Sequence, residues 1–153
     1  MKIIKKYYNE IIYIYTTINI NSNKYIKLNN RIGGFTVLKS KALFVILSGA
    51  ENPVKVLLGL NMAWRTMNSG AFQDVKLILV GQAEDFIAKT DDKEVLEAYE
   101  QILNNNIMSH ACVVIADAYG VTDILIGKKV IMVPSAGGCI AQLMSEGYQP
   151  MTF

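Results

Sequence analysis

One histidine and two cysteines are all that the 153-residue chain offers of the side chains that most often bind transition metals. A single histidine, His110, rules out a multi-histidine metal site. Cys112 and Cys139 are far apart and form no CxxC pair, which argues against thioredoxin-type redox chemistry and zinc knuckles. Two cysteines do not make a disulfide framework in a chain of this length, so we expect reduced thiols and a cytoplasmic protein.

Several other signatures are missing. The chain has no GxGxxG, no GxxxxGK[ST] and no GxSxG motif, which leaves dinucleotide binding, P-loop nucleotide binding and serine hydrolysis without their motifs. We therefore expect neither a metal nor an organic cofactor. No apolar run after the first quarter is longer than the six residues of Ala42–Leu47, far short of the roughly 20 residues that a membrane span needs. No secretory signal pattern opens the chain, and we expect no membrane partner.

Charge is scarce and unevenly spread. Charged residues make up 18% of the chain and apolar residues 52%, a composition that predicts an oligomer hiding part of its apolar surface. Residues 1–36 hold six Lys/Arg against Glu10 alone, whereas residues 37–153 hold nine Lys/Arg against twelve Asp/Glu. An acidic body has no electrostatic footprint for nucleic acid, so we expect no nucleic-acid partner.

The first quarter differs from the rest in composition. Of its first 30 residues, 24 are Ile, Asn, Lys or Tyr, all encoded by codons that A and T alone can form. We interpret residues 1–36 as an atypical extension that arises from translated upstream sequence, with a natural start near Val37. The alternatives are a β-rich arm, because Ile11–Ile20 is rich in strand-forming residues, and a basic tail that contacts anionic surfaces. Residues 37–153 are then a single α/β domain.

Short apolar runs alternate with helical patterns along this domain. Strands are predicted at Ala42–Leu47, at Val75–Val80, within Ile107–Ile115 and at Val130–Val133, and the tail Tyr148–Phe153 is extended at best. Helices are predicted from Asn52-Pro53 to Asn68, around Ala83–Lys89, from Asp91–Asp92 to Asn104–Asn106, near Ala116–Tyr119 and over Gly137–Glu146. This alternation predicts an α/β fold, a mostly parallel sheet of four to five strands with helices on both faces. Ligands and reactive groups of such sheets gather beyond the carboxyl ends of the strands.

The pattern leaves two settings open for Cys112. If the strand is Ala111–Ile115, the cysteine is a small buried core residue. If the strand is Ile107–Cys112, the thiol stands at its carboxyl end before a helix, where amides and the helix dipole favour the thiolate. His110 would then lie on the same face and act as a polarising group. Cys139, at the start of the last helix, is a candidate second thiol or a packed residue of the Gly137–Gly138 turn.

Ser48-Gly-Ala-Glu-Asn-Pro-Val-Lys stands before the predicted long helix, and the strand Lys76–Val80 ends in Gly81. Further along come Ala111-Cys112, then Gly120-Val121, then Val133-Pro-Ser-Ala-Gly-Gly and Ser145-Glu-Gly-Tyr148. With these segments in this order, the chain from Lys41 to Phe153 resembles the DsrE/DsrF-like family of small sulfur-relay proteins. Cys139 stands where one subgroup often has an acidic residue, so the resemblance implies no role for it.

The resemblance implies a flavodoxin-like α/β/α fold and assembly as a trimer or hexamer. It also implies that Cys112 stands at the carboxyl end of its strand and carries a persulfide for transfer between proteins. We expect a sulfur carrier or sulfurtransferase-like protein whose partners are a sulfur donor and an acceptor protein. The alternative, from a different class, is a non-catalytic oligomeric module that binds a small anion or a protein at the strand ends, with Cys112 buried.

Overall fold

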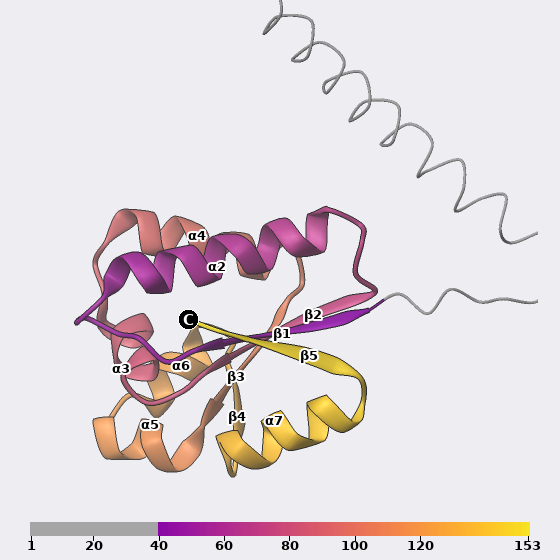
Figure 1. Ribbon diagram of the computed structural model, residues 1–153. Helices are drawn as coiled ribbons and strands as arrows, with labels where there is room; N and C mark the ends of the chain where they lie inside the picture. The colour runs from indigo at the N-terminus through magenta and orange to yellow at the C-terminus, as the bar shows by residue number, and fades with distance from the viewer. Residues whose placement is uncertain (1–39) are drawn as a thin grey trace, which may run out of the picture. The chain divides into compact units, whose positions relative to one another are not determined.

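A computed structural model describes residues 40–153, which contain five strands and six helices (Figure 1). The predicted extension over residues 1–36 lies outside the described residues. The strands are β1 (Lys41–Ile46), β2 (Asp74–Leu79), β3 (Met108–Cys112), β4 (Ile131–Val133) and β5 (Tyr148–Thr152). The helices are α2 (Pro53–Asn68), α3 (Gln82–Lys89), α4 (Lys93–Asn104), α5 (Val113–Tyr119), α6 (Thr122–Gly127) and α7 (Ala136–Ser145).

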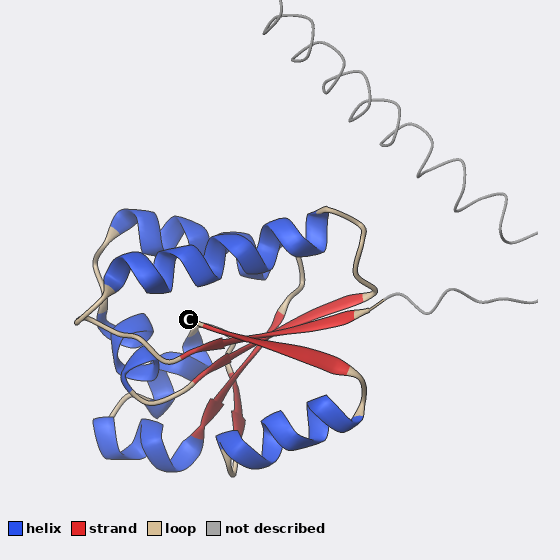
Figure 2. Cartoon of the chain, in the orientation of Figure 1, coloured by secondary structure: helices blue, strands red, loops and turns tan. Residues whose placement is uncertain are grey.

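The strands form one parallel sheet in the order β4-β3-β2-β1-β5. Helices α2 and α4 cover one face and α7 covers the other, so the sheet is the middle of three layers (Figure 2). The predicted α/β/α class with a parallel sheet is confirmed. The first four strands follow one another across the sheet, and β5 returns to the free side of β1.

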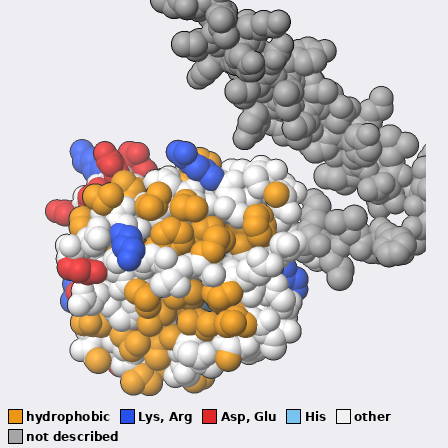
Figure 3. Space-filling view, in the orientation of Figure 1, with side chains coloured by type: hydrophobic (Ala, Val, Ile, Leu, Met, Phe, Trp, Pro, Cys, Tyr) orange, Lys and Arg blue, Asp and Glu red, His pale blue; other side chains and the backbone are white. Residues whose placement is uncertain are grey.

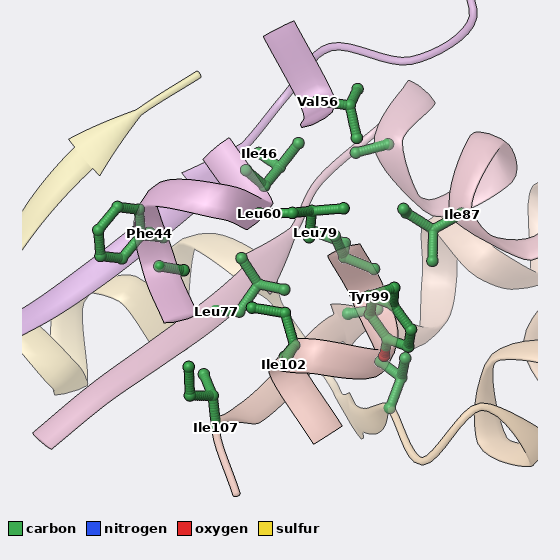
Figure 4. Packing of buried hydrophobic residues seen from close by; sticks show 14 of the residues in the cluster. Phe44, Ile46, Val56, Leu60, Leu77, Leu79, Ile87, Tyr99, Ile102 and Ile107 are labelled. Atoms are coloured by element: carbon green, nitrogen blue, oxygen red, sulfur yellow. The ribbon is translucent and has the colours of Figure 1, made fainter. Parts of the chain in front are cut away.

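Alternation along β1 divides the core between the two faces. Ala42, Phe44 and Ile46 point toward α2 and α4, whereas Leu43 and Val45 point toward α7. All five side chains are buried, which is why this strand reads as a continuous apolar run rather than as an alternating pattern. Figure 4 shows the larger cluster, where Leu60, Leu77 and Ile102 meet between helices and sheet.

Local signals set the starts of the two long helices. The Asn52 side chain accepts a hydrogen bond from the Lys55 amide at 3.2 Å, and Pro53 occupies the first helical position. At α4, the Asp92 carboxylate accepts from the amides of Glu94 and Val95 at 2.9 and 3.3 Å. Both helices therefore begin where the sequence predicts.

The C-terminal segment forms a strand that the sequence pattern does not show. β5 reads Tyr-Gln-Pro-Met-Thr, which lacks a strand-like apolar alternation. It pairs in parallel with β1 at the edge of the sheet, with Pro150 opposite Leu43. An edge strand tolerates a proline because one of its sides has no neighbouring strand to receive a hydrogen bond.

None of the helices in residues 40–153 has the length and apolar character needed to cross a bilayer.

Candidate functional site at the carboxyl ends of the strands

Cys112 is the last residue of β3 and the residue from which α5 starts. Of the two settings that the sequence leaves open, the strand that ends at Cys112 is the one observed. A strand over Ala111–Ile115 is wrong, because Val113 begins a helix. Val113–Ile115 form the first turn of that helix. Hydropathy alone does not distinguish an apolar helical turn from a buried strand.

The Cys112 thiol is buried nonetheless, with 6% of the residue exposed. It lies on the α7 face of the sheet, in a cluster with Val45, Ile78 and Ala136. Its sulfur is 3.8 Å from the carbonyl oxygen of Pro134, to which the thiol donates a weak hydrogen bond. Pro134 follows β4, so the loop between β4 and α7 lies against the sulfur.

A buried carboxyl group holds the backbone of Cys112. Glu84, in the first turn of α3, is 0% exposed, and its Oε1 accepts from the Cys112 amide at 3.2 Å. Its Oε2 is buried with no hydrogen-bond partner. Burial raises the pKa of Glu84 to about 7, although hydrogen bonds from the amides of Cys112 and Gly81 act in the opposite direction.

Sequence reasoning missed Glu84, but a signal for it exists. The buried residues of α3 are Ala83, Glu84, Ile87 and Ala88, which share one face at helical spacing. Glu84 therefore occupies a core position of that pattern. A carboxylate at such a position is rare enough to indicate a specific role.

His110 precedes Cys112 by two residues in β3 and lies on the same face of the sheet. Its ring is buried, and Nδ1 is 3.2 Å from the carbonyl oxygen of Leu77 in the neighbouring strand. Because a carbonyl only accepts, Nδ1 carries the proton. Burial lowers the pKa of His110, the bond to Leu77 raises it and Lys76 lowers it; the net shift is downward and favours the neutral ring. Its hydrogen bond goes to Leu77 and not to Cys112.

Cys139 lies in the first turns of α7, partly buried against the apolar cluster that contains Cys112. The two thiols thus border the same apolar cluster on the α7 face of the sheet. Burial raises the pKa of Cys139; Lys76 lowers it and Glu146 raises it. The cap of this helix is Ser135, whose hydroxyl accepts from the Gly138 amide at 3.2 Å.

A shallow cleft of about 210 Å³ opens at the same end of the sheet. It is lined by Ala50 after β1, by Gln82, Asp85 and Phe86 of α3, and by Tyr119 at the end of α5. Cys112 does not line it. Among residues 40–153, no three His, Cys, Asp or Glu side chains lie close enough together to hold a metal ion.

Comparison with known proteins agrees with this architecture. A conserved protein of unknown function, BT1422, from Bacteroides thetaiotaomicron is similar in fold, with a TM-score of 0.62 and 21% sequence identity; the match covers 78% of this chain and 100% of that one. The ychN protein from E. coli is similar with a TM-score of 0.60 and 16% identity, covering 74% of this chain and 99% of that one. MTH1491, a protein of unknown function from Methanobacterium thermoautotrophicum, is similar with a TM-score of 0.54 and 22% identity, covering 74% of this chain and 99% of that one. No curated protein sequence matches the chain.

The model of the DsrE/DsrF-like family matches residues 40–153 and so takes in every described strand and helix. That family is associated with sulfur relay, and the predicted resemblance is confirmed. This chain belongs to the DsrE/DsrF-like family.

Proposed function

We propose that this protein is a sulfur carrier that holds a persulfide on Cys112 and passes it to a partner thiol. The observation that carries the proposal is the position of Cys112 at the carboxyl end of β3, in a chain of the DsrE/DsrF-like family. Reactive groups of parallel sheets collect at this edge. No other cysteine of the described residues ends a strand, since Cys139 lies inside α7.

The chemistry is thiol–persulfide exchange. The Cys112 thiolate attacks the outer sulfur of a donor persulfide, a new S–S bond forms at Cys112, and the donor leaves as a thiolate. An acceptor thiolate then attacks the outer sulfur on Cys112. The acceptor thereby becomes the persulfide, and Cys112 leaves as a thiolate. Both steps depend on the thiolate fraction and on access to the sulfur.

Access sets a structural requirement. Because the residue is 6% exposed and the Pro134 carbonyl lies against the sulfur, the loop between β4 and α7 must move aside for a donor to reach it. Docking of the donor at the strand ends is the natural trigger for that movement. We therefore infer that a protein donor loads Cys112 faster than a small persulfide does.

The test is intact-mass analysis of the native protein after treatment with a persulfide donor. Wild type and Cys139→Ser gain one sulfur, and Cys112→Ser gains none. Peptide mapping places the added sulfur on Cys112. Equal gain in Cys112→Ser, or no gain in wild type at any donor concentration, would overturn the proposal.

Burial of Cys112 favours a second candidate, a non-catalytic oligomeric module that binds a small anion or a protein partner at the strand ends. The two are separated by iodoacetamide labelling of the native chain. A carrier is labelled at Cys112 without denaturant, whereas the binding module is labelled there only after unfolding.

We further propose that the chain forms a homo-oligomer, a trimer or hexamer as the family resemblance implies. Support comes from α2, where Val54, Leu58 and Met62 are 74, 51 and 39% exposed at a spacing of four residues. Such a stripe lies along one side of a helix. Figure 3 shows hydrophobic side chains gathered on the face of the molecule that carries α2 in Figure 1.

A further inference from the structure

Glu84 has no part in the sulfur exchange described above, yet it is bonded to the residue that performs it. The hydrogen-bond ladder between β2 and β3 ends at the pair Leu79–Ala111. Beyond that pair, β2 has turned toward α3 and offers no further strand partner. The Glu84 carboxyl supplies the acceptor for the next amide, that of Cys112, at 3.2 Å.

The other carboxyl oxygen is unusual. Oε2 of Glu84 is buried with no hydrogen-bond partner, in a side chain that is 0% exposed. The Cys112 amide needs only one carboxyl oxygen as its acceptor. Burying the second oxygen without a partner costs desolvation free energy, which an apolar side chain at this position would not incur. A carboxyl group at this position is thus better explained by its charge and its closeness to Cys112 than by packing.

We propose that Glu84 is a positioning residue for Cys112: its buried carboxyl group fixes the strand-to-helix junction through the Cys112 amide, and its charge state sets how fast the thiol reacts. The inference rests on the proposed sulfur-carrier function, which it deepens. The sulfur is three bonds from the amide nitrogen, so it lies within about 7 Å of the carboxyl group. Two negative charges that close in a buried site disfavour one another.

Few other groups can produce the same effect. The titratable groups on the elements packed against α3 and Cys112 are Lys76 in β2, Cys139 in α7, His110 in β3, Asp117 and Tyr119 in α5, and Asp123 in α6. The last three are exposed, and Asp85 of α3 itself pairs with Lys89. His110 is buried, burial lowers its pKa, and the His110→Asn variant below separates its effect from that of Glu84.

The test is the rate of iodoacetamide labelling of Cys112 between pH 5.5 and 9. A thiol with no titrating neighbour is labelled ten times faster per pH unit until it ionises fully. Wild type is expected to depart from that slope near pH 7, because Glu84 becomes charged there and its negative charge slows the reaction of the nearby sulfur. Glu84→Gln keeps an oxygen that accepts from the Cys112 amide but removes the charge. The labelling rate of this variant is therefore expected to rise with pH without an inflexion and to be roughly tenfold higher than that of wild type at pH 8.

Glu97→Gln, at an exposed position of α4, is the matched control and keeps the wild-type profile. His110→Asn keeps the inflexion near pH 7, which assigns it to Glu84. A wild-type profile with no inflexion, a Glu84→Gln profile that superimposes on wild type, or slower labelling in Glu84→Gln would overturn the inference, and so would a Cys112 that is inert in both proteins. If Cys112 shows the expected profiles but accepts no sulfur, the carrier function fails and the role of Glu84 stands.

Discussion

Glu84 is the one buried acidic side chain among residues 40–153, and its burial makes the free energy of unfolding depend on pH. Its pKa is about 7 in the folded chain, against 4.5 as the ordinary value. Between those two pH values the folded chain holds the proton and the unfolded chain releases it. The contribution of Glu84 to the free energy of unfolding is therefore fully present below pH 4.5 and declines as the pH rises to about 7.

Glu84→Gln removes this dependence. We expect the stability of wild type relative to Glu84→Gln to be greater at pH 5 than at pH 8 by about 3 kcal/mol at most, since each unit of pKa shift is about 1.4 kcal/mol. Urea denaturation of both proteins across that range measures it. Glu97→Gln should differ from wild type by a constant amount, and a constant difference for Glu84→Gln would mean that the carboxyl titrates normally.

At the scale of elements, α2 packs closely against β1 and the C-terminal segment. A Cβ on Gly59 would lie 2.3 Å from Cδ1 of the buried Ile46 and 3.1 Å from the Phe153 side chain. Phe153 in turn stacks on Phe44, with ring centroids 5.8 Å apart. The glycine therefore lets the helix, β1 and the residue that follows β5 meet at one point.

Gly59→Ala tests this contact. Alanine favours a helix by about 1 kcal/mol over glycine, but forced overpacking costs about 1–3 kcal/mol. We expect a net loss of stability of about 1 kcal/mol, read from the urea midpoint. Gly127→Ala, in α6, is the control because a Cβ there meets nothing within 4 Å. A Gly59→Ala protein more stable than wild type would show that α2 does not approach β1 this closely.

Elements and their starts were predictable where the signal is local. Asn52-Pro53 and Asp92 act on amides two or three residues away, so spacing in the sequence is spacing in space. The end of β3 is different, because the Cys112 amide donates its hydrogen bond to Glu84, which lies in another element 28 positions earlier. For a similar reason the sequence predicts an extended tail over Tyr148–Phe153 but not its pairing, because the pairing of β5 with β1 comes from tertiary position and not from its own residues. The family resemblance supplied the strand end that hydropathy could not.

At the scale of the whole molecule, the apolar stripe on α2 exposes three large side chains in a row to solvent. Val54, Leu58 and Met62 would each lose contact with water in an oligomer. Burial of such a stripe is a common way for a chain with few charged residues to associate.

Leu58→Glu places a charge in the middle of that stripe. We expect light scattering to show wild type as a trimer or hexamer and Leu58→Glu as a smaller species, because burying an unpaired carboxylate costs several kcal/mol. Gln101→Glu adds the same charge at an exposed position of α4 and should leave the mass unchanged. A wild type that is monomeric, or a Leu58→Glu protein of unchanged mass, would place the interface elsewhere or remove it.

Transfer of sulfur from the loaded protein to an acceptor is the most direct test of the carrier function of Cys112. Native chain loaded with a persulfide donor is freed of donor and then mixed with a thiol acceptor, and the masses of both are recorded over time. Cys112 is expected to lose its added sulfur while the acceptor gains an equal amount, with no transfer from Cys112→Ser. Sulfur that stays on the protein, or transfer that persists in Cys112→Ser, would contradict it.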